Sequence, residues 1–202
     1  MLKIYHAKNT RSVRIVWLCE ELGIPYELQT LNFAPADLQS EAYLAIHPLG
    51  KVPAVDEDGL ILNESGAITQ YLLAKYGKGR LEPKHGTPEH AKFLHWFHFA
   101  EATFMGPLGN IAQHAFIRPE ADRIPQVAQE GQQNAKKMLD VLEKELTGKN
   151  YVCGSEFSAA DIMLGYALLL CKLFGLLTPA HPNVSAYFGR LSERPAFQKA
   201  TA

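Results

Sequence analysis

A proline at the start of a short strand limits what this chain can fold into more than any other feature. Residues 50–55 (GKVPAV) and Leu60–Leu62 read as two strands, and the Asp58-Gly59 pair between them is a hairpin signal. Proline cannot donate a hydrogen bond to a sheet, so Pro53 belongs on an edge or in a special turn. Most bonds before proline are trans. A cis bond after Val52 would instead turn the Val52 backbone outward, where it can pair with an extended ligand.

The segment after the hairpin predicts a pocket for a charged head group. Glu64 and Ser65 stand at the mouth of a helix that is expected to run from about Ser65 to Tyr76. The free N–H groups and the positive end of the helix dipole favour a carboxylate there. A strand edge beside such a pocket suggests a small peptide as the ligand.

The first part of the chain alternates strands and helices. Lys3–His6 and Tyr26–Leu31 are predicted strands, with a helix over Val13–Leu22 between them and helical turns over Ala34–Ile46. With the hairpin and its helix, the order is β-α-β, then α, then β-β-α. This order predicts a sheet covered by helices in residues 1–78.

The second part carries only helical patterns. Residues 76–88 are rich in glycine, proline and charge, and they read as a linker. A long helix is expected from Pro88, with a kink or break at Gly106-Pro107, and another helix is expected over Pro125–Leu146. The predicted fold class is therefore α/β plus all-α, with domains at residues 1–78 and 88–202.

Composition removes several classes of function. The 202-residue chain has a formal net charge of -1 and no apolar run long enough to span a bilayer, so neither nucleic acid nor a membrane is an expected partner. Cys19, Cys153 and Cys171 show no C-x-x-C spacing, and the eight histidines form no metal-binding motif. We therefore expect reduced thiols, no metal and a cytoplasmic location.

Two patterns together resemble the cytosolic glutathione S-transferase superfamily. The first is Gly-Lys-Val-Pro-Ala at 50–54 with Glu-Ser-Gly-Ala-Ile at 64–68. The second is a capping-box pattern, Ser158 to Asp161, preceded by Phe157. The likeness covers nearly the whole chain, and the turn at residues 9–12 resembles that of the bacterial serine- or threonine-type members. It implies a thioredoxin-like glutathione-binding domain and an all-helical domain that forms the hydrophobic substrate site.

The resemblance implies a glutathione transferase. Glutathione, the co-substrate, loses its thiol proton, and the thiolate attacks a hydrophobic electrophile, as in detoxification. The alternatives are a glutathione-dependent peroxidase, isomerase or dehalogenase, and a non-catalytic binding protein with the same fold. A homodimer is implied by the family alone.

The group that activates the thiol is expected in the turn after the first strand. A free cysteine thiol has a pKa of about 8.5, so a hydrogen-bond donor is needed to favour the thiolate at neutral pH. The resemblance makes Thr10 the best match to the serine of the serine-type members, with Ser12, Asn9 and Tyr5 as rivals. Ser12 also has a simpler interpretation as the N-cap of the following helix, and Tyr5 has one as a packing residue.

The resemblance also implies how the peptide part of glutathione is held. Val52, before Pro53, pairs through its backbone with the cysteinyl unit. Glu64 and Ser65 receive the amine and carboxylate of the γ-glutamyl unit.

Three further side chains are candidates at the edges of the site. Lys51 is placed to meet the glycyl carboxylate, although a solvated loop lysine is its simpler interpretation. The resemblance implies a second basic or polar contact from about a dozen residues before Lys51, where only Gln39 could serve. Phe104 belongs to an aromatic run expected beside the electrophile, although most of that run reads as core.

Overall fold

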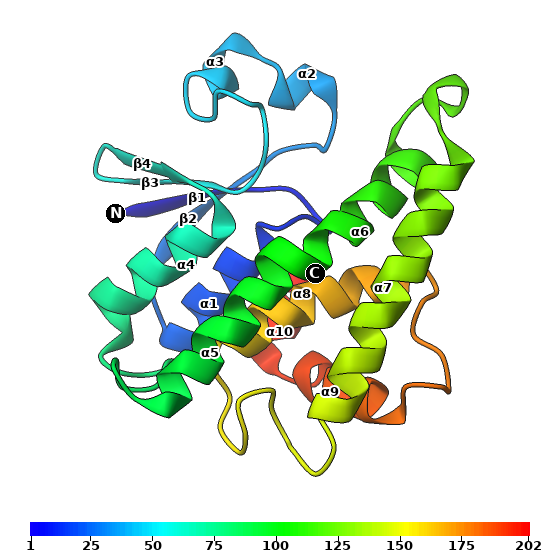
Figure 1. Cartoon of the computed structure of the whole chain (residues 1–202). Helices are drawn as coiled ribbons and strands as arrows, with labels where there is room; N and C mark the ends of the chain where they lie inside the picture. The colour runs from blue at the N-terminus through cyan, green and yellow to red at the C-terminus, as the bar shows by residue number, and fades with distance from the viewer. The chain divides into compact units, whose positions relative to one another are not determined.

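The computed structural model describes all residues from 1 to 202 and divides into two compact units. The first unit contains Met1–Pro83 together with Ser192–Ala202, and the second contains Lys84–Leu191. The first unit is a sheet with helices and the second is entirely helical (Figure 1). The predicted fold class, α/β plus all-α, is confirmed.

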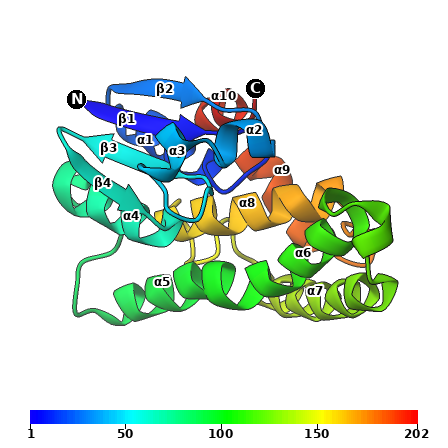
Figure 2. The same ribbon diagram turned by 90° about the horizontal axis from the view of Figure 1, so that it is seen from above.

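The first unit is built on a four-stranded sheet in the order β2-β1-β3-β4, seen side by side in Figure 2. β1 and β2 are parallel, whereas β3 is antiparallel to both β1 and β4. The elements follow the predicted order, with bounds β1 Leu2–His6, α1 Val13–Leu22, β2 Tyr26–Thr30, α2 Pro35–Leu38, α3 Glu41–Leu44, β3 Ala54–Glu57, β4 Leu60–Asn63, α4 Ser65–Leu72 and the π-helical turn η1 Leu73–Gly77.

Local signals explain where these elements turn. Asp58 and Gly59 both have positive φ, 52° and 92°, as the tight hairpin between β3 and β4 requires. Gly23 ends α1 in the left-handed region at φ 68°. The hairpin and the helix end therefore lie where the sequence predicted them.

The second unit consists of helices, and its elements are α5 Pro88–His98, η2 Phe99–Phe104, α6 Met105–Ile111, η3 Ala112–Ile117, η4 Glu120–Asp122, α7 Pro125–Glu145, α8 Ala159–Leu173 and α9 Pro182–Ser192. Thr87 caps α5 by accepting a hydrogen bond from the backbone N–H of His90 at 3.2 Å. Of the predicted kink or break at Gly106-Pro107, the break is wrong, because both residues lie inside α6. The irregularity lies instead in the π-helical turn η2 just before α6, where the hydrogen-bond register changes.

A capping box opens α8, as predicted. The Asp161 carboxylate accepts the backbone N–H of Ser158 at 2.8 Å. It also accepts the backbone N–H of Val152 at 2.9 Å and the hydroxyl of Tyr187 at 2.7 Å. One fully buried carboxylate thus joins α8 to the loop before it and to α9.

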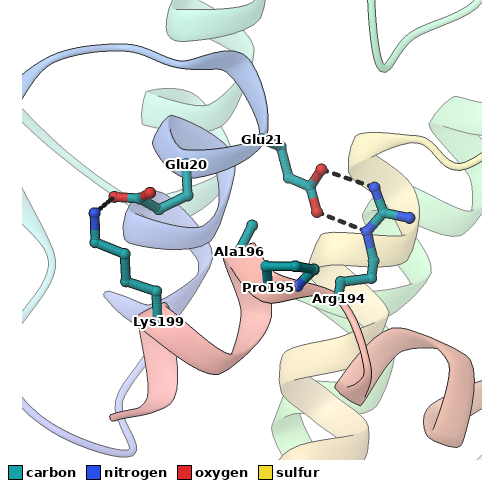
Figure 3. A pocket seen from close by; sticks show the side chains of 6 residues that line it. All are labelled: Glu20, Glu21, Arg194, Pro195, Ala196 and Lys199. Atoms are coloured by element: carbon teal, nitrogen blue, oxygen red, sulfur yellow. Dashed lines mark hydrogen bonds and ion pairs between the residues drawn. The ribbon is translucent and has the colours of Figure 1, made fainter.

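The C-terminal helix α10 (Pro195–Thr201) departs from the predicted division, which placed it with the helical domain. It packs on α1 of the first unit, where the rings of Trp17 and Phe197 meet edge to face at 4.8 Å. Two ion pairs also join this end of the chain to α1 (Figure 3). Arg194 binds Glu21 through two hydrogen bonds of 2.6 and 2.7 Å, and Lys199 contacts Glu20 at 2.7 Å. The last helix of the chain therefore packs as part of the first unit.

None of the helices combines the length and the apolar character that crossing a bilayer requires.

Candidate functional site

The sheet register gathers three separate segments at one end of the first unit. Tyr5 of β1 pairs with Ala54 of β3, and Ala54 pairs with Asn63 of β4, so these three residues form one row across the sheet. The chain leaves β1 and β4 and enters β3 at this row. The turn at residues 7–12, the Val52–Pro53 bond and the Glu64-Ser65 pair therefore lie next to one another.

The Val52–Pro53 peptide bond is cis, the form that would present the Val52 backbone to a ligand. β3 begins only at Ala54, so the backbone of Val52 is not paired with another strand. The Val52 side chain packs into a small apolar cluster with Ala7 and Tyr43. The Tyr43 hydroxyl donates to the carbonyl of Lys51 at 2.6 Å. These contacts fix the segment while the Lys51 side chain stays exposed.

Gln39 lies against the same segment through Gly50. Gly50 has φ 56°, and a Cβ placed there would lie 2.2 Å from Nε2 of Gln39 and 2.3 Å from the carbonyl oxygen of Leu38. Only glycine fits both the backbone conformation and this close approach. The structure thus places Gln39 against Gly50, the residue before Lys51.

Glu64 and Ser65 stand at the N-terminus of α4, as predicted. Glu64 has φ 69°, a conformation that is costly for a residue with a long side chain and that clusters at functional sites. Its side chain is exposed and makes no capping bond, whereas Ser65 is buried. The Ser65 hydroxyl accepts a hydrogen bond of 3.0 Å from Nη1 of Arg14.

Arg14 was missed from the sequence, although a signal was present. It stands in the middle of the apolar run Val13–Cys19, where every side chain is buried. A buried guanidinium needs a hydrogen-bonding partner, and Ser65 is one. Arg14 therefore places positive charge behind the mouth of α4, which strengthens the preference of that helix end for a carboxylate.

The turn after β1 holds the three candidates for thiol activation. Asn9 is exposed at φ 60°, Thr10 is 9% exposed, and Ser12 is completely buried. The Thr10 hydroxyl donates to the carbonyl of Ala7 at 2.7 Å and lies 2.7 Å from the Ser12 hydroxyl. Of the two residues, Thr10 is the more exposed.

Ser12 stands at the N-cap position of α1, as the simpler interpretation predicts, but its side chain makes no capping bond. Its hydroxyl points back toward β1, where it accepts the N–H of Ala7 at 3.2 Å and lies 2.8 Å from Nδ1 of His6. The turn folds the Ser12 side chain away from the helix N–H groups and into the core of the turn.

The cysteines and the aromatic candidate do not add to this site. Burial raises the pKa of Cys19 to about 12 and that of Cys153 to about 11, so neither favours the reactive thiolate at neutral pH. Phe104 belongs to the second unit, is completely buried, and meets the ring of Phe99 at a centroid distance of 6.1 Å. The proposed site does not include Phe104, because a side chain without exposed surface cannot contact a substrate.

Comparisons with known proteins agree on one family over nearly the whole chain. The family described as Glutathione S-transferase, N-terminal domain, matches residues 1–74, and Glutathione S-transferase, C-terminal domain, matches residues 125–190. Glutathione S-transferase 1 from Zea mays is 31% identical, over 100% of this chain and 96% of its own length. Glutathione S-transferase 3 from Schizosaccharomyces pombe is 29% identical, over 97% of this chain and 85% of its own.

Comparison with a solved structure indicates the same family. The theta class glutathione S-transferase from Xanthomonas axonopodis pv. citri, solved with glutathione bound, has a TM-score of 0.83 to this chain at 29% identity. The alignment covers 99% of this chain and 96% of that one.

Proposed function

Because the chain belongs to the cytosolic glutathione S-transferase superfamily and is a transferase, we propose that it holds glutathione where the three strand ends meet and transfers its thiolate to hydrophobic electrophiles. The observation that carries this proposal is the row formed by Tyr5, Ala54 and Asn63. That row brings a hydroxyl turn, an unpaired backbone segment and a helix N-terminus together, and each suits a different part of a γ-linked tripeptide.

Each of the three residues of glutathione has a proposed partner along this arrangement. The γ-glutamyl amine and carboxylate meet Glu64 and Ser65, with Arg14 behind them. The cysteinyl unit pairs with the backbone of Val52. Lys51 and Gln39 lie on the side where the glycyl carboxylate ends.

Thr10 is the proposed donor to the sulfur. Thr10 is the more exposed of the two hydroxyl residues in the turn. A hydrogen bond to the charged form of an acid such as a thiol lowers the pKa of that acid. Each unit of that lowering corresponds to about 1.4 kcal/mol in favour of the thiolate. The cysteines of the chain are not needed as nucleophiles, because the co-substrate brings its own thiol.

We also propose that the second substrate is an apolar electrophile and that the protein forms a homodimer. The helical unit exposes Phe116, Ile117 and Ile124, each by about half of its surface, as expected of a unit that meets apolar molecules. A shallow groove of about 410 Å³ along α5 and η2, lined by residues that include His98 and Phe99, is the surface where we expect the second copy. Analytical ultracentrifugation of the wild type and of a Phe99→Glu variant tests the dimer.

Retention on immobilised glutathione followed by turnover of chlorodinitrobenzene tests the main proposal. Thr10→Ala should keep glutathione affinity but lower kcat/KM about 10- to 100-fold near pH 6.5, because the thiolate loses its donor. Thr10→Ser, which keeps the hydroxyl, should restore most of the activity. Unchanged turnover in Thr10→Ala would exclude Thr10 as the donor. Retention without turnover, combined with reduction of a peroxide, would favour the peroxidase alternative.

A further inference from the structure

Behind the proposed thiol donor lies a buried chain of three side chains from the end of β1 and the turn that follows. His6 is 7% exposed, Ser12 is 0% exposed and Thr10 is 9% exposed. Nδ1 of His6 lies 2.8 Å from the Ser12 hydroxyl, and that hydroxyl lies 2.7 Å from the Thr10 hydroxyl. No part of the glutathione site requires a histidine at this position.

The hydrogen-bonding capacity of the two hydroxyls allows two arrangements of their protons. A hydroxyl donates one hydrogen and accepts two. The Ser12 hydroxyl already accepts the N–H of Ala7. The Ser12 hydroxyl therefore accepts from one of His6 and Thr10 and donates to the other. The Ala7 carbonyl, at 3.2 Å, is a longer alternative acceptor for the Ser12 hydrogen.

The tautomer of His6 decides between these arrangements. If Nδ1 carries the hydrogen, it fills the second acceptor position of Ser12, and Ser12 donates to Thr10. Thr10 then accepts from Ser12 and keeps its own hydrogen for an acceptor other than Ser12. If Nδ1 is bare, Ser12 donates to His6, and the Thr10 hydrogen is drawn inward to Ser12.

We propose that His6 is a positioning residue whose Nδ1–H orders the Ser12 and Thr10 hydroxyls so that Thr10 donates toward the glutathione sulfur. The inference rests on the proposed function and extends it by one residue that does not touch the substrate. Without ligand, Thr10 donates to the Ala7 carbonyl at 2.7 Å. With glutathione bound, the same hydrogen turns to the thiolate, a charged acceptor that makes the stronger bond.

The environment of His6 supports a neutral ring. Burial lowers the pKa of His6 below its ordinary value. A neutral imidazole carries only one ring hydrogen, so the choice of nitrogen has a consequence for Ser12. Chains of hydrogen bonds in a buried setting also strengthen one another, so the effect of His6 reaches Thr10 through Ser12.

The test measures the thiol pKa of glutathione bound to the full-length protein, from the ultraviolet absorbance of the thiolate. His6→Leu and Ser12→Ala should each raise this pKa by about one unit, with an accompanying fall in kcat/KM of about tenfold below the wild-type thiol pKa. His6→Asn should restore most of the shift, because the asparagine amide can donate from nearly the position of Nδ1. Calorimetric affinity for glutathione should stay within about twofold in all three variants, since none of these residues contacts the proposed peptide-binding groups.

The outcomes separate this inference from the function on which it rests. A wild-type thiol pKa that is lowered, but unchanged by both His6→Leu and Ser12→Ala, overturns the role of His6 and leaves the transferase site intact. Equal damage from His6→Asn and His6→Leu also overturns it, because packing alone would then be the role of the ring. If His6→Leu does not fold, Ser12→Ala and His6→Asn decide the question. A wild type that binds no glutathione overturns both proposals together.

Discussion

The strongest stability prediction concerns Asp161, the buried carboxylate at the start of α8. Asp161→Ala removes the acceptor of four donors: the backbone N–H groups of Ser158 and Val152, and the hydroxyls of Ser158 and Tyr187. All of these bonds lie in the buried interior. The substitution therefore leaves polar groups without partners where water cannot replace the lost bonds.

The size of the effect follows from these contacts. Loss of an N-cap interaction costs about 1 kcal/mol, and each further buried donor left unsatisfied costs about 1–3 kcal/mol. We expect Asp161→Ala to lower the free energy of unfolding by about 4 kcal/mol, a large part of the ~5–15 kcal/mol that holds a typical domain together.

Urea unfolding followed by far-ultraviolet circular dichroism measures this loss. With a slope of about 2 kcal/mol per molar urea, the midpoint should fall by about 2 M. The matched control is Thr87→Ala. It removes a more exposed cap that accepts one helix N–H at 3.2 Å and donates to the Lys84 carbonyl at 2.8 Å, and it should cost only about 1 kcal/mol. If Asp161→Ala costs no more than Thr87→Ala, the reasoning from buried donors is refuted.

Two further predictions concern the first unit. Burial alone would raise the pKa of Glu57, but Lys75 and two tyrosine hydroxyls outweigh it and lower that pKa from 4.5 to about 2. The stabilisation that the Glu57 carboxylate gives the folded state is therefore complete above pH 4.5 and is lost as the pH falls toward 2. The difference in unfolding free energy between the wild type and Glu57→Gln should shrink over that range. A constant difference would contradict the assignment. Gly50→Ala should weaken glutathione binding, measured by calorimetry, by at least about tenfold, because the added Cβ would lie 2.2 and 2.3 Å from neighbouring atoms. The control is Gly59→Ala, also at positive φ but with nothing within 4 Å of the added Cβ, and it should leave binding unchanged. Equal effects of the two substitutions would argue against the role of Gly50.

Sequence reasoning located the elements whose causes are local. The Asp58-Gly59 turn and the Ser158–Asp161 capping box both lie where short-range rules place them. The same rules misjudged Ser12, because an N-cap pattern does not reveal that a histidine at the end of β1 competes for the hydroxyl. A break at Gly106-Pro107 was misjudged for a related reason: α6 continues through both residues, and the π-helical turn η2 lies just before them.

Contacts between distant residues could not be predicted from such rules. Arg194 and Glu21 are separated by 173 positions, yet they join α10 to α1. Nothing in the sequence near either residue indicates its partner, and the helical character of α10 assigned it to the wrong unit. Arg14 was hidden in the same way, because its partner Ser65 lies 51 positions further along the chain.

The dependence of the site on sheet register links the stability of the hairpin to binding. Side chains alternate between the two faces of a strand, so a slip of one residue between β3 and β4 would move the Glu64-Ser65 pair by about 3.3 Å relative to the 52–53 segment and reverse the faces of β4. Val52 would stay in its cluster with Ala7 and Tyr43, so the two halves of the proposed site would no longer be in register. The hairpin turn at Asp58 and Gly59 lies at the opposite end of β3 and β4 from the site, yet it fixes which residues of these strands pair. Lengthening that turn by one residue should therefore weaken glutathione binding without altering any residue that is proposed to touch the ligand.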